Sequence, residues 1–425
     1  MEEAFLHFIW KFQQFKDRVL STDTGIEINV LHPGTRNSDA GPDFKNAKIK
    51  IGEIKWNGSV EIHVHARDWY RHNHQNDAAY DNVILHVVWD NDAFARRKDN
   101  TTIPTLELKN NVEERLILNY KKLMEPAADI LCKKIIHGIK PITILSMVDK
   151  VLAQRLEDRS QAIFREIALT NNDWEEIAWR MLCKNFGFKT NAFPFVELGK
   201  SLPINILKKE AHSLKTIEAL LFGQAGFLED DLEDTYYQEL KKEYNFKGKK
   251  YNLEKRLNRH QWKFLRLRPA NFPTIRIAQL SALIASQANL FSLFTNFLSI
   301  KDIKNSLGVT QSEYWINHYN FGVKTENKTK KLGAFSIDNI LINTAAPLLF
   351  AYGIHRDQEE LKEKAMKLLA SVKPELNSII KKWRALGMEI SSAFDSQGLI
   401  QLYNQYCLKK RCLSCSIGVE IIKSV

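Results

Sequence analysis

The stretch that decides the fold is Gly41–Trp89, GPDFKNAKIKIGEIKWNGSVEIHVHARDWYRHNHQNDAAYDNVILHVVW. It contains short runs of apolar and β-branched residues between turn residues, a pattern typical of β-strands. The pair Asn57-Gly58 predicts a tight hairpin turn. We expect strands over 47–51, 54–56, 60–65 and 83–89, and either a helix or an ordered loop over 68–81.

A predicted helix precedes these strands. Apolar residues recur at helical spacing near the start of the chain, so we expect a helix over about 2–19. Further strand signals flank the quoted stretch at 26–31 and 105–108. The expected order is therefore helix, strand, hairpin, helix-like segment and strand, which indicates an α/β domain.

The second part of the chain predicts helices. After about Val112 strand signals are sparse, and apolar stripes recur at helical spacing, as from Leu145 to Leu156. A chain of 425 residues is also too long for one ordinary core. We therefore expect an α+β protein, with an α/β domain over residues 1–125 and a large, mainly helical domain over 126–425.

Composition limits the class of protein and its partners. The hydrophobic share of 44% and the charged share of 26% are those of a globular protein. The N-terminus lacks the pattern of a signal peptide, and the longest apolar stretch, 340–352, is too short and too polar to span a bilayer. We expect a cytoplasmic protein without a membrane span.

The chain is basic. Its net charge of +11 favours an anionic partner, and nucleic acid is the partner we expect. The alternative is a lysine-rich surface that reflects an AT-rich genome. The chain contains no Walker loop, Rossmann glycine pattern or Gly-x-Ser-x-Gly elbow, which disfavours nucleotide hydrolysis and serine esterase chemistry.

Acidic residues on neighbouring strands predict a metal site. Asp43 opens one expected strand and Glu61 lies in the next. Carboxylate oxygens suit Mg²⁺ or Mn²⁺, and phosphodiester hydrolysis uses such an ion to generate hydroxide and to offset charge. Alternate residues of a strand share a face, so Glu61, His63 and His65 should point the same way. The hypothesis requires the two carboxylates to lie within about 6 Å, the range of strong interaction.

The same residues resemble a nuclease core. Pro42-Asp43 followed by Glu61-Ile62-His63 is similar to the PD-(D/E)XK motif. The resemblance covers about Glu2 to Leu108 and implies a restriction-endonuclease-like α/β core with a mixed sheet. It also implies that the acidic pair binds the metal, and that the residue two positions after the second acid helps to activate water. That position holds His63 here, where the family has lysine.

The downstream part resembles the very-short-patch-repair-like branch of these nucleases. There an acidic strand is followed by a histidine, an aspartate and a return strand, matched here by His74, Asp77 and 83–89. The resemblance implies that Asp43, Glu61 and His74 bind the metal. His63 or His74 would orient or deprotonate the attacking water, and Asp77 would fix a histidine.

Three alternatives stay open for this cluster. Asp43 fits a turn or cap, and Glu61 fits an ion pair with Lys55 or Arg67 on the sheet surface. The missing lysine at His63 fits a catalytically inactive core that binds nucleic acid or serves as a scaffold. The pair His63-x-His65 is also similar to metal-binding β-barrels of the cupin kind, where nitrogen ligands favour Zn²⁺, Fe²⁺ or Mn²⁺.

A cysteine cluster lies near the end of the chain. Cys407, Cys412 and Cys415 form C-x4-C-x2-C among basic residues, a spacing that suits Zn²⁺ or an iron–sulfur cluster. Cys183 and Cys132 are the candidates for a fourth ligand, and Cys183 completes the predicted set. The pattern resembles that of helicase-associated nucleases with one upstream and three terminal cysteines. Reduced thiols packed at the terminus are the alternative.

Basic and aromatic residues alternate around Lys263–Pro269. We expect Arg266, Arg268 and Arg276 to hold the phosphates of a nucleic acid. An amphipathic segment with its arginines on the solvated face is the alternative.

The whole chain resembles a bacterial domain-of-unknown-function family. Four stretches carry that resemblance: GPDF at Gly41, GSVEIHVHARDW at Gly58, RPANFPTIRIAQL at Arg268 and CLKKRCLSCSIG at Cys407.

Overall fold

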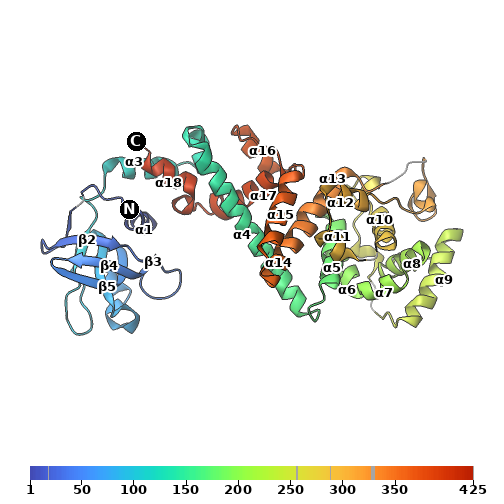
Figure 1. The fold of residues 1–425 in the computed structure, drawn as a ribbon, viewed down its shortest axis with the longest axis horizontal. Helices are drawn as coiled ribbons and strands as arrows, with labels where there is room; N and C mark the ends of the chain where they lie inside the picture. The colour runs from blue at the N-terminus through green and yellow to red at the C-terminus, as the bar shows by residue number, and fades with distance from the viewer. Residues whose placement is uncertain (18, 255–256, 288, 327–330, 425) are drawn as a thin grey trace. The chain divides into compact units, whose positions relative to one another are not determined.

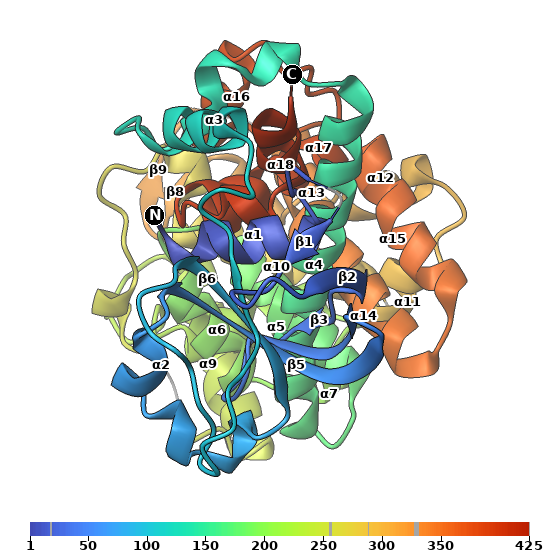
Figure 2. The ribbon, with the colours of Figure 1, turned by 90° about the vertical axis from the view of Figure 1, so that its left-hand side faces the viewer.

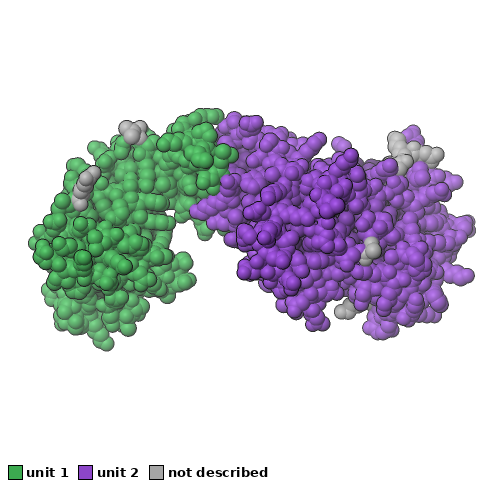
Figure 3. Space-filling model, in the orientation of Figure 1, with its two compact units in different colours: residues 1–147, 402–425 green, residues 148–401 purple. Residues whose placement is uncertain are grey.

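The computed structural model describes residues 1–17, 19–254, 257–287, 289–326 and 331–424. The chain forms two compact units, Met1–Met147 with Leu402–Val425, and Val148–Gln401 (Figure 3). Unit 1 therefore contains both ends of the described chain, whereas the sequence predicted one boundary near residue 125. Helix α4, Pro141–Ala168, begins in unit 1 and continues into unit 2, and α17, Ala393–Leu402, returns.

Unit 1 is built on a mixed sheet, as predicted (Figure 1). The strand order is β1-β2-β4-β5-β6-β7, with β3 paired to β4. The β5–β6 and β6–β7 pairs are parallel, and the other pairs are antiparallel. The strands are β1 (Leu20–Ser21), β2 (Glu27–His32), β3 (Thr35–Arg36), β4 (Phe44–Ile51), β5 (Ile54–His65), β6 (Val83–Asp90) and β7 (Thr105–Glu107).

The hairpin predicted at Asn57-Gly58 is wrong, because β5 runs through both residues without a break. The turn lies instead at Gly52-Glu53, where Ile51 pairs with Ile54. Gly52 supplies the positive φ of 58° that such a turn requires. Gly58 has a different role: a Cβ there would lie 2.4 Å from the Ile84 side chain, so glycine allows β6 to approach closely.

Helix α1, Glu3–Phe12, packs against β5 and lies beside the sheet (Figure 2). It is shorter than the predicted 2–19. The helix ends because Gln13 adopts a left-handed φ of 51°, and its backbone N–H bonds to the carbonyls of Ile9 and Trp10. The buried side chains include Phe5, Phe8 and Ile9, so the predicted apolar face is confirmed over this shorter span.

A short connection links β5 to the parallel strand β6. It consists of α2 (Asp68–Arg71), η1 (His74–Asn76) and η2 (Ala78–Tyr80). Trp69 and Tyr80 are buried with Val83, and the Trp69 indole donates a hydrogen bond of 3.0 Å to the Arg96 carbonyl. These anchors hold the intervening residues, among them His72 and His74, in place.

The remaining elements of unit 1 join chain segments that are far apart in sequence. Helix α18 packs against α3, and the Asn119 side chain donates to the Ile422 carbonyl at 3.2 Å. These elements are α3 (Glu114–Met124), η3 (Leu131–Lys134), η4 (Ile136–Gly138), η9 (Tyr403–Cys407), η10 (Cys412–Ser414) and α18 (Ser416–Lys423).

Unit 2 is mainly helical, as predicted. Its described strands are β8 (His318–Asn320) and β9 (Val323–Lys324), and one large core extends through the unit. The central helix is α10 (Pro273–Ser286), in which every residue from Pro273 to Ile284 is buried. The other helices are α5 (Trp174–Phe186), α6 (Ala192–Ser201), α7 (Ile204–Lys209), α8 (Leu214–Gln224), α9 (Thr235–Lys250), η5 (Arg259–Gln261), η6 (Pro269–Asn271), α11 (Leu290–Thr295), α12 (Ile300–Leu307), η7 (Glu313–Ile316), α13 (Ala334–Ile340), η8 (Leu341–Ala345), α14 (Ala346–Arg356), α15 (Glu359–Ser371) and α16 (Ser378–Ala385).

The residues from Ala334 to Arg356 form one continuous helical run. Within the described residues, Ala334–Arg356 is long and apolar enough to cross a membrane, and 78% of its apolar window is buried inside the fold. A helix buried in a protein core has the same composition.

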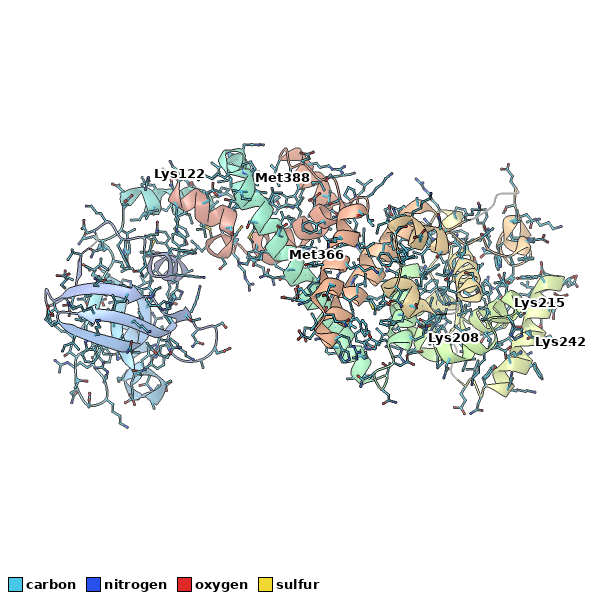
Figure 4. All side chains as sticks on the ribbon, in the orientation of Figure 1. Lys122, Lys208, Lys215, Lys242, Met366 and Met388 are labelled. Atoms are coloured by element: carbon cyan, nitrogen blue, oxygen red, sulfur yellow. The ribbon has the colours of Figure 1, made fainter. Side chains whose placement is uncertain are left out.

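Lysines cover the exposed side of several helices in unit 2. Lys208, Lys215 and Lys242, labelled in Figure 4, lie exposed on α7, α8 and α9. Lys215 pairs with Glu239 on α9 at 2.5 Å. Such solvated pairs contribute little to stability, because water screens them.

Glu218 on α8 is a buried acid in the core of unit 2. Its side chain accepts hydrogen bonds from the Tyr236 hydroxyl and from Ser312 Oγ, the latter at 2.9 Å. Burial raises the pKa of Glu218 to about 7, so the folded protein holds this proton more tightly than the unfolded chain does.

We predict that unit 2 loses stability as the pH rises from about 4.5 through 7. The raised pKa of Glu218 stabilises the fold below the unfolded pKa, and the loss is on the order of 3 kcal/mol. Glu218→Gln should remove this pH dependence. Urea unfolding of both proteins at pH 5 and pH 7.5 measures it. Glu239→Gln, at an exposed position on α9, is the control, and an equal slope in Glu218→Gln and the native protein would contradict the prediction.

Candidate metal centre

Asp43 and Glu61 lie side by side and hold each other. The Asp43 backbone N–H donates to Glu61 Oε2 at 3.1 Å, and the Ile62 N–H donates to Asp43 Oδ2 at 3.1 Å. Glu61 thus accepts a hydrogen bond from the Asp43 backbone, directly before β4, and Asp43 accepts one from the residue after Glu61 on β5. The arrangement agrees with the proximity that the metal-site hypothesis requires.

A β-bulge places the two acids on one face. Ala47 pairs with Gly58, but Phe44 pairs with Val60, so the register shifts by one residue between them. Asn46, in the bulge, has a positive φ of 60°. The shift sets Asp43 opposite Glu61, whereas an unbroken register would set it opposite Ile62. Because opposite residues of an antiparallel pair share a face, the bulge brings the carboxylates together.

Helix α1 adds two titratable side chains to this centre. His7 Nε2 lies 3.0 Å from Asp43 Oδ2 and 3.9 Å from Glu3 Oε1. Arg36 Nη2 lies 3.0 Å from His7 Nδ1. Arginine can only donate, so His7 Nδ1 accepts and the Nε2 proton faces the carboxylates. The prediction from sequence missed both residues, although their spacing of four on the predicted helix places them on one face.

Three imidazoles gather next to Glu61. The ligand atoms of His63, His72 and His74 all lie within 4.8 Å of one another. His63 Nε2 and His74 Nε2 each lie 3.4 Å from Glu61 Oε1. His72 Nδ1 lies 3.2 Å from His63 Nε2, and of the three side chains only His72 is exposed. The centre therefore combines carboxylate oxygens with imidazole nitrogens and reaches solvent at His72.

His86 contacts the histidine trio through His63. It is fully buried on β6, and its Nε2 lies 2.9 Å from His63 Nδ1. If His63 Nε2 binds an ion, its Nδ1 carries the proton and donates to His86 Nε2. A single polar residue in the apolar run 83–89 was the available signal for His86 in the sequence.

Burial sets the protonation of the centre. It raises the pKa of Glu61, and the Asp43 carboxylate adds to the rise. Burial together with His74 and His72 lowers the pKa of His63 to about 4. Burial and the neighbouring Asp43 also raise the pKa of Glu3. His63 is consequently neutral near pH 7, and its nitrogen lone pair is available to a metal.

Two predicted roles look different in the structure. The Asp77 carboxylate accepts a hydrogen bond of 2.9 Å from the Ala79 N–H and caps η2, and among the described residues it pairs with no histidine. His65 lies apart from the trio, near Asp92 at 3.6 Å and Asp90 at 3.8 Å. Tyr80 stacks on the His74 ring at 3.8 Å and holds that ring instead of Asp77.

Four cysteines form a second cluster in unit 1. They are Cys132 in η3, Cys407, Cys412 and Cys415, and all are thiols. Burial raises the pKa of Cys132 to about 12, and Cys415 and Cys412 add to the rise. Burial also raises the pKa of Cys407, and the other three thiols contribute. Burial and neighbouring thiols of the cluster thus raise the pKa of Cys132, Cys407 and Cys412.

The choice of Cys183 as the fourth member is wrong. Cys183 is fully buried in the core of unit 2, 3.1 Å from where a Cβ on Gly199 would lie. The Cys132 segment is instead tied to the terminal cysteines by the Tyr403 hydroxyl, which donates to Asp129 at 2.7 Å. Sequence spacing left both candidates open, because the fourth ligand depends on this long-range contact.

The three arginines divide into two kinds. Arg266 and Arg268 are exposed, which fits both the expected contact with nucleic acid and a solvated face. Arg276 is only 6% exposed on α10, so it does not lie on an open surface for a phosphate backbone.

The comparisons with known proteins identify the family of the chain. A family model described as a protein of unknown function, DUF2851, matches residues 3–378. The chain belongs to this family, and the whole-chain resemblance is confirmed. No curated protein and no solved structure matched. The nuclease resemblance stays a prediction.

We predict that His86 controls metal affinity through His63. His86→Phe keeps the buried volume similar but removes the acceptor for His63 Nδ1–H, so affinity for Zn²⁺ or Mn²⁺ should fall about 10- to 100-fold. Calorimetric titration measures it. His65→Ala, outside the trio, should leave affinity unchanged, and equal affinity in His86→Phe and the native protein would refute the role.

Proposed function

We propose that unit 1 is a metal-dependent phosphodiesterase with a restriction-endonuclease-like core that cleaves DNA or RNA. The observation that carries the proposal is the pair of hydrogen bonds that joins Asp43, directly before β4, to Glu61 and Ile62 on β5. Two further observations support the proposal. The order of helix, antiparallel strands, crossover and parallel strand agrees with the nuclease core that the sequence resembles. The net charge of +11 favours an anionic substrate.

Each residue of the centre has a part in this proposal. Asp43, Glu61 and His74 would hold the ion, and His63 would add a neutral nitrogen. When bound, Mg²⁺ or Mn²⁺ lowers the pKa of a water ligand and offsets charge on the phosphate. The exposed His72 is placed to accept the proton of the attacking water. The water oxygen then bonds to phosphorus, the ester bond breaks, and the leaving oxygen takes up a proton.

The imidazole trio favours a second candidate function. Three nitrogens within 4.8 Å of one another suit Zn²⁺ or Fe²⁺ better than Mg²⁺. A metalloenzyme of another reaction class would use the same ligands. Metal analysis of the purified protein separates the candidates, because Zn or Fe at the trio would support this second function.

The decisive experiment measures cleavage of single- and double-stranded DNA and of RNA with Mn²⁺. We expect Asp43→Asn and Glu61→Gln each to lose at least about 100-fold in rate, since each removes a charged ligand. His65→Ala is the matched control. Cleavage that survives both changes would reject the nuclease assignment. Salt-sensitive binding without any cleavage would indicate the inactive scaffold instead.

We also propose a second metal in unit 1, held by Cys132, Cys407, Cys412 and Cys415. Four thiols from two distant segments match the Cys₄ ligand set of Zn²⁺ and of iron–sulfur clusters. Helix α1 contacts η10, and the Glu2 carboxylate accepts a hydrogen bond of 2.5 Å from Tyr120. An ion at the cysteines would therefore steady the helix that brings Glu3 and His7 to the first centre.

Metal analysis of variants tests this cysteine site. We expect Cys132→Ser to lose Zn or iron and to unfold at lower temperature, because a structural metal contributes folding free energy. Cys183→Ala, in the core of unit 2, should keep its full metal content. An absorbance band at about 400 nm identifies an iron–sulfur cluster, and zinc found by metal analysis without this band identifies a zinc site. Metal retained in Cys132→Ser would overturn the site.

A further inference from the structure

Unit 2 contains a pocket that the proposed nuclease centre does not use. Its volume is about 440 Å³, within the range of small-ligand sites. Its walls come from the end of α5, the start of α6, η6, α10 and the start of α13. Phe186, Phe188, Phe195 and Phe335 supply an aromatic lining.

Arg276 lies in the wall of this pocket and is 6% exposed. Its Nη1 donates to Gln279 at 3.0 Å and to Ser336 at 3.1 Å, and its Nη2 donates to Asn271 at 2.7 Å. All three acceptors are neutral. Among the described residues no carboxylate pairs with Arg276, and its buried Nε has no hydrogen-bond partner.

A buried cation without a counter-ion is unfavourable unless something compensates it. Burial lowers the pKa of Arg276 to about 10, so the side chain stays charged at neutral pH. The Phe188 ring lies 4.6 Å from the guanidinium carbon and offsets only part of the cost. Phe188 itself has a positive φ of 48°, a strained conformation for a bulky residue. The fold thus combines two unfavourable features in this pocket, the buried charge of Arg276 and the strained backbone of Phe188.

The charges of the pocket define what would compensate Arg276. Lys331 is a second cation in the lining, and none of the lining residues, all of them described, is acidic. Two cations match a dianion, and a phosphomonoester carries a charge of about −1.5 to −2 at pH 7. The aromatic side chains match a flat or apolar body attached to the phosphate.

We propose that this pocket binds a terminal phosphate attached to a nucleoside, either a free nucleotide or the phosphorylated end of a nucleic acid strand. The proposal goes beyond the metal centre of unit 1 and does not depend on it. A buried arginine selects a phosphate that enters the pocket, whereas backbone phosphates meet exposed cations such as Arg268. Arg276 would bind through its unpartnered Nε.

Binding to the full-length protein tests the proposal. Calorimetric titration uses adenosine 5′-monophosphate, adenosine, inorganic phosphate, and one oligonucleotide with and without a 5′-phosphate. We expect the monophosphate to bind at least about 10-fold more tightly than adenosine, because the phosphate faces two cations. Tight binding of the free nucleotide alone identifies a nucleotide site, and tight binding of the phosphorylated oligonucleotide alone identifies a strand-end site.

Two variants link the binding to Arg276. Arg276→Gln should weaken phosphate-dependent binding at least about 10-fold, and Lys242→Gln, at an exposed lysine on α9 outside the pocket, should not change it. Without ligand, Arg276→Gln should unfold at the same or a higher temperature, because it removes an uncompensated charge. An arginine with only a structural role would give the opposite shift.

Several results would overturn the proposal. They are no binding of any phosphate probe, equal binding in Arg276→Gln and the native protein, or a lower unfolding temperature of Arg276→Gln together with unchanged binding. If Arg276→Gln does not fold, Lys331→Ala replaces it. Lys331 is exposed at the pocket, and its loss should weaken phosphate-dependent binding about 5-fold. Unchanged affinity in Lys331→Ala would then reject the site.

Discussion

The hydrogen bonds that fix Asp43 and Glu61 next to each other are the constraint on which the site in unit 1 depends. Hydrogen bonds from the Asp43 and Ile62 backbone N–H groups fix the two acids, so a buried and a partly buried carboxyl group lie close together. Such proximity is unfavourable without compensation. His7, His63 and His74 all lie within 3.4 Å of one of the two carboxylates, and Arg36 orients His7. Helix α1, the β-bulge and the connection after β5 therefore all serve to bring the two carboxyl groups and their histidine partners together.

The periodicity of the sequence was enough for the strands, the mixed sheet and the helical second part, because these depend on local patterns. It was not enough at Gly58, where it predicted a turn inside the continuous strand β5. An Asn-Gly pair favours a turn locally, yet the close approach of Ile84 explains the glycine within a continuous strand. Helix α1 ended early for a similar reason, since the left-handed Gln13 left no signal in the apolar pattern.

Within the candidate site, the residues that belong to a sequence motif could be predicted. The residues that reach the site only through the packing of other elements could not. Asp43, Glu61, His63 and His74 lie together as predicted. Glu3, His7 and His86 come from other elements, and Asp77 caps a turn instead of a histidine. Cys132 and Arg276 could not be predicted correctly for the same reason. Long-range contacts decide which cysteines lie near Cys132, and they also decide that Arg276 is buried.

The return of the chain from unit 2 to unit 1 has a consequence for biosynthesis. Cys132 leaves the ribosome before residues 148–401, and the other three cysteines of its cluster leave after them. At roughly 5–20 residues per second, this interval lasts on the order of 10 to 50 seconds. The sheet and its acidic pair are synthesised before residues 148–401, and the segment that packs on α3 is synthesised after them. Unit 1 can therefore close only once residues 148–401 have been synthesised, and until then Cys132 lacks the other three thiols of its cluster.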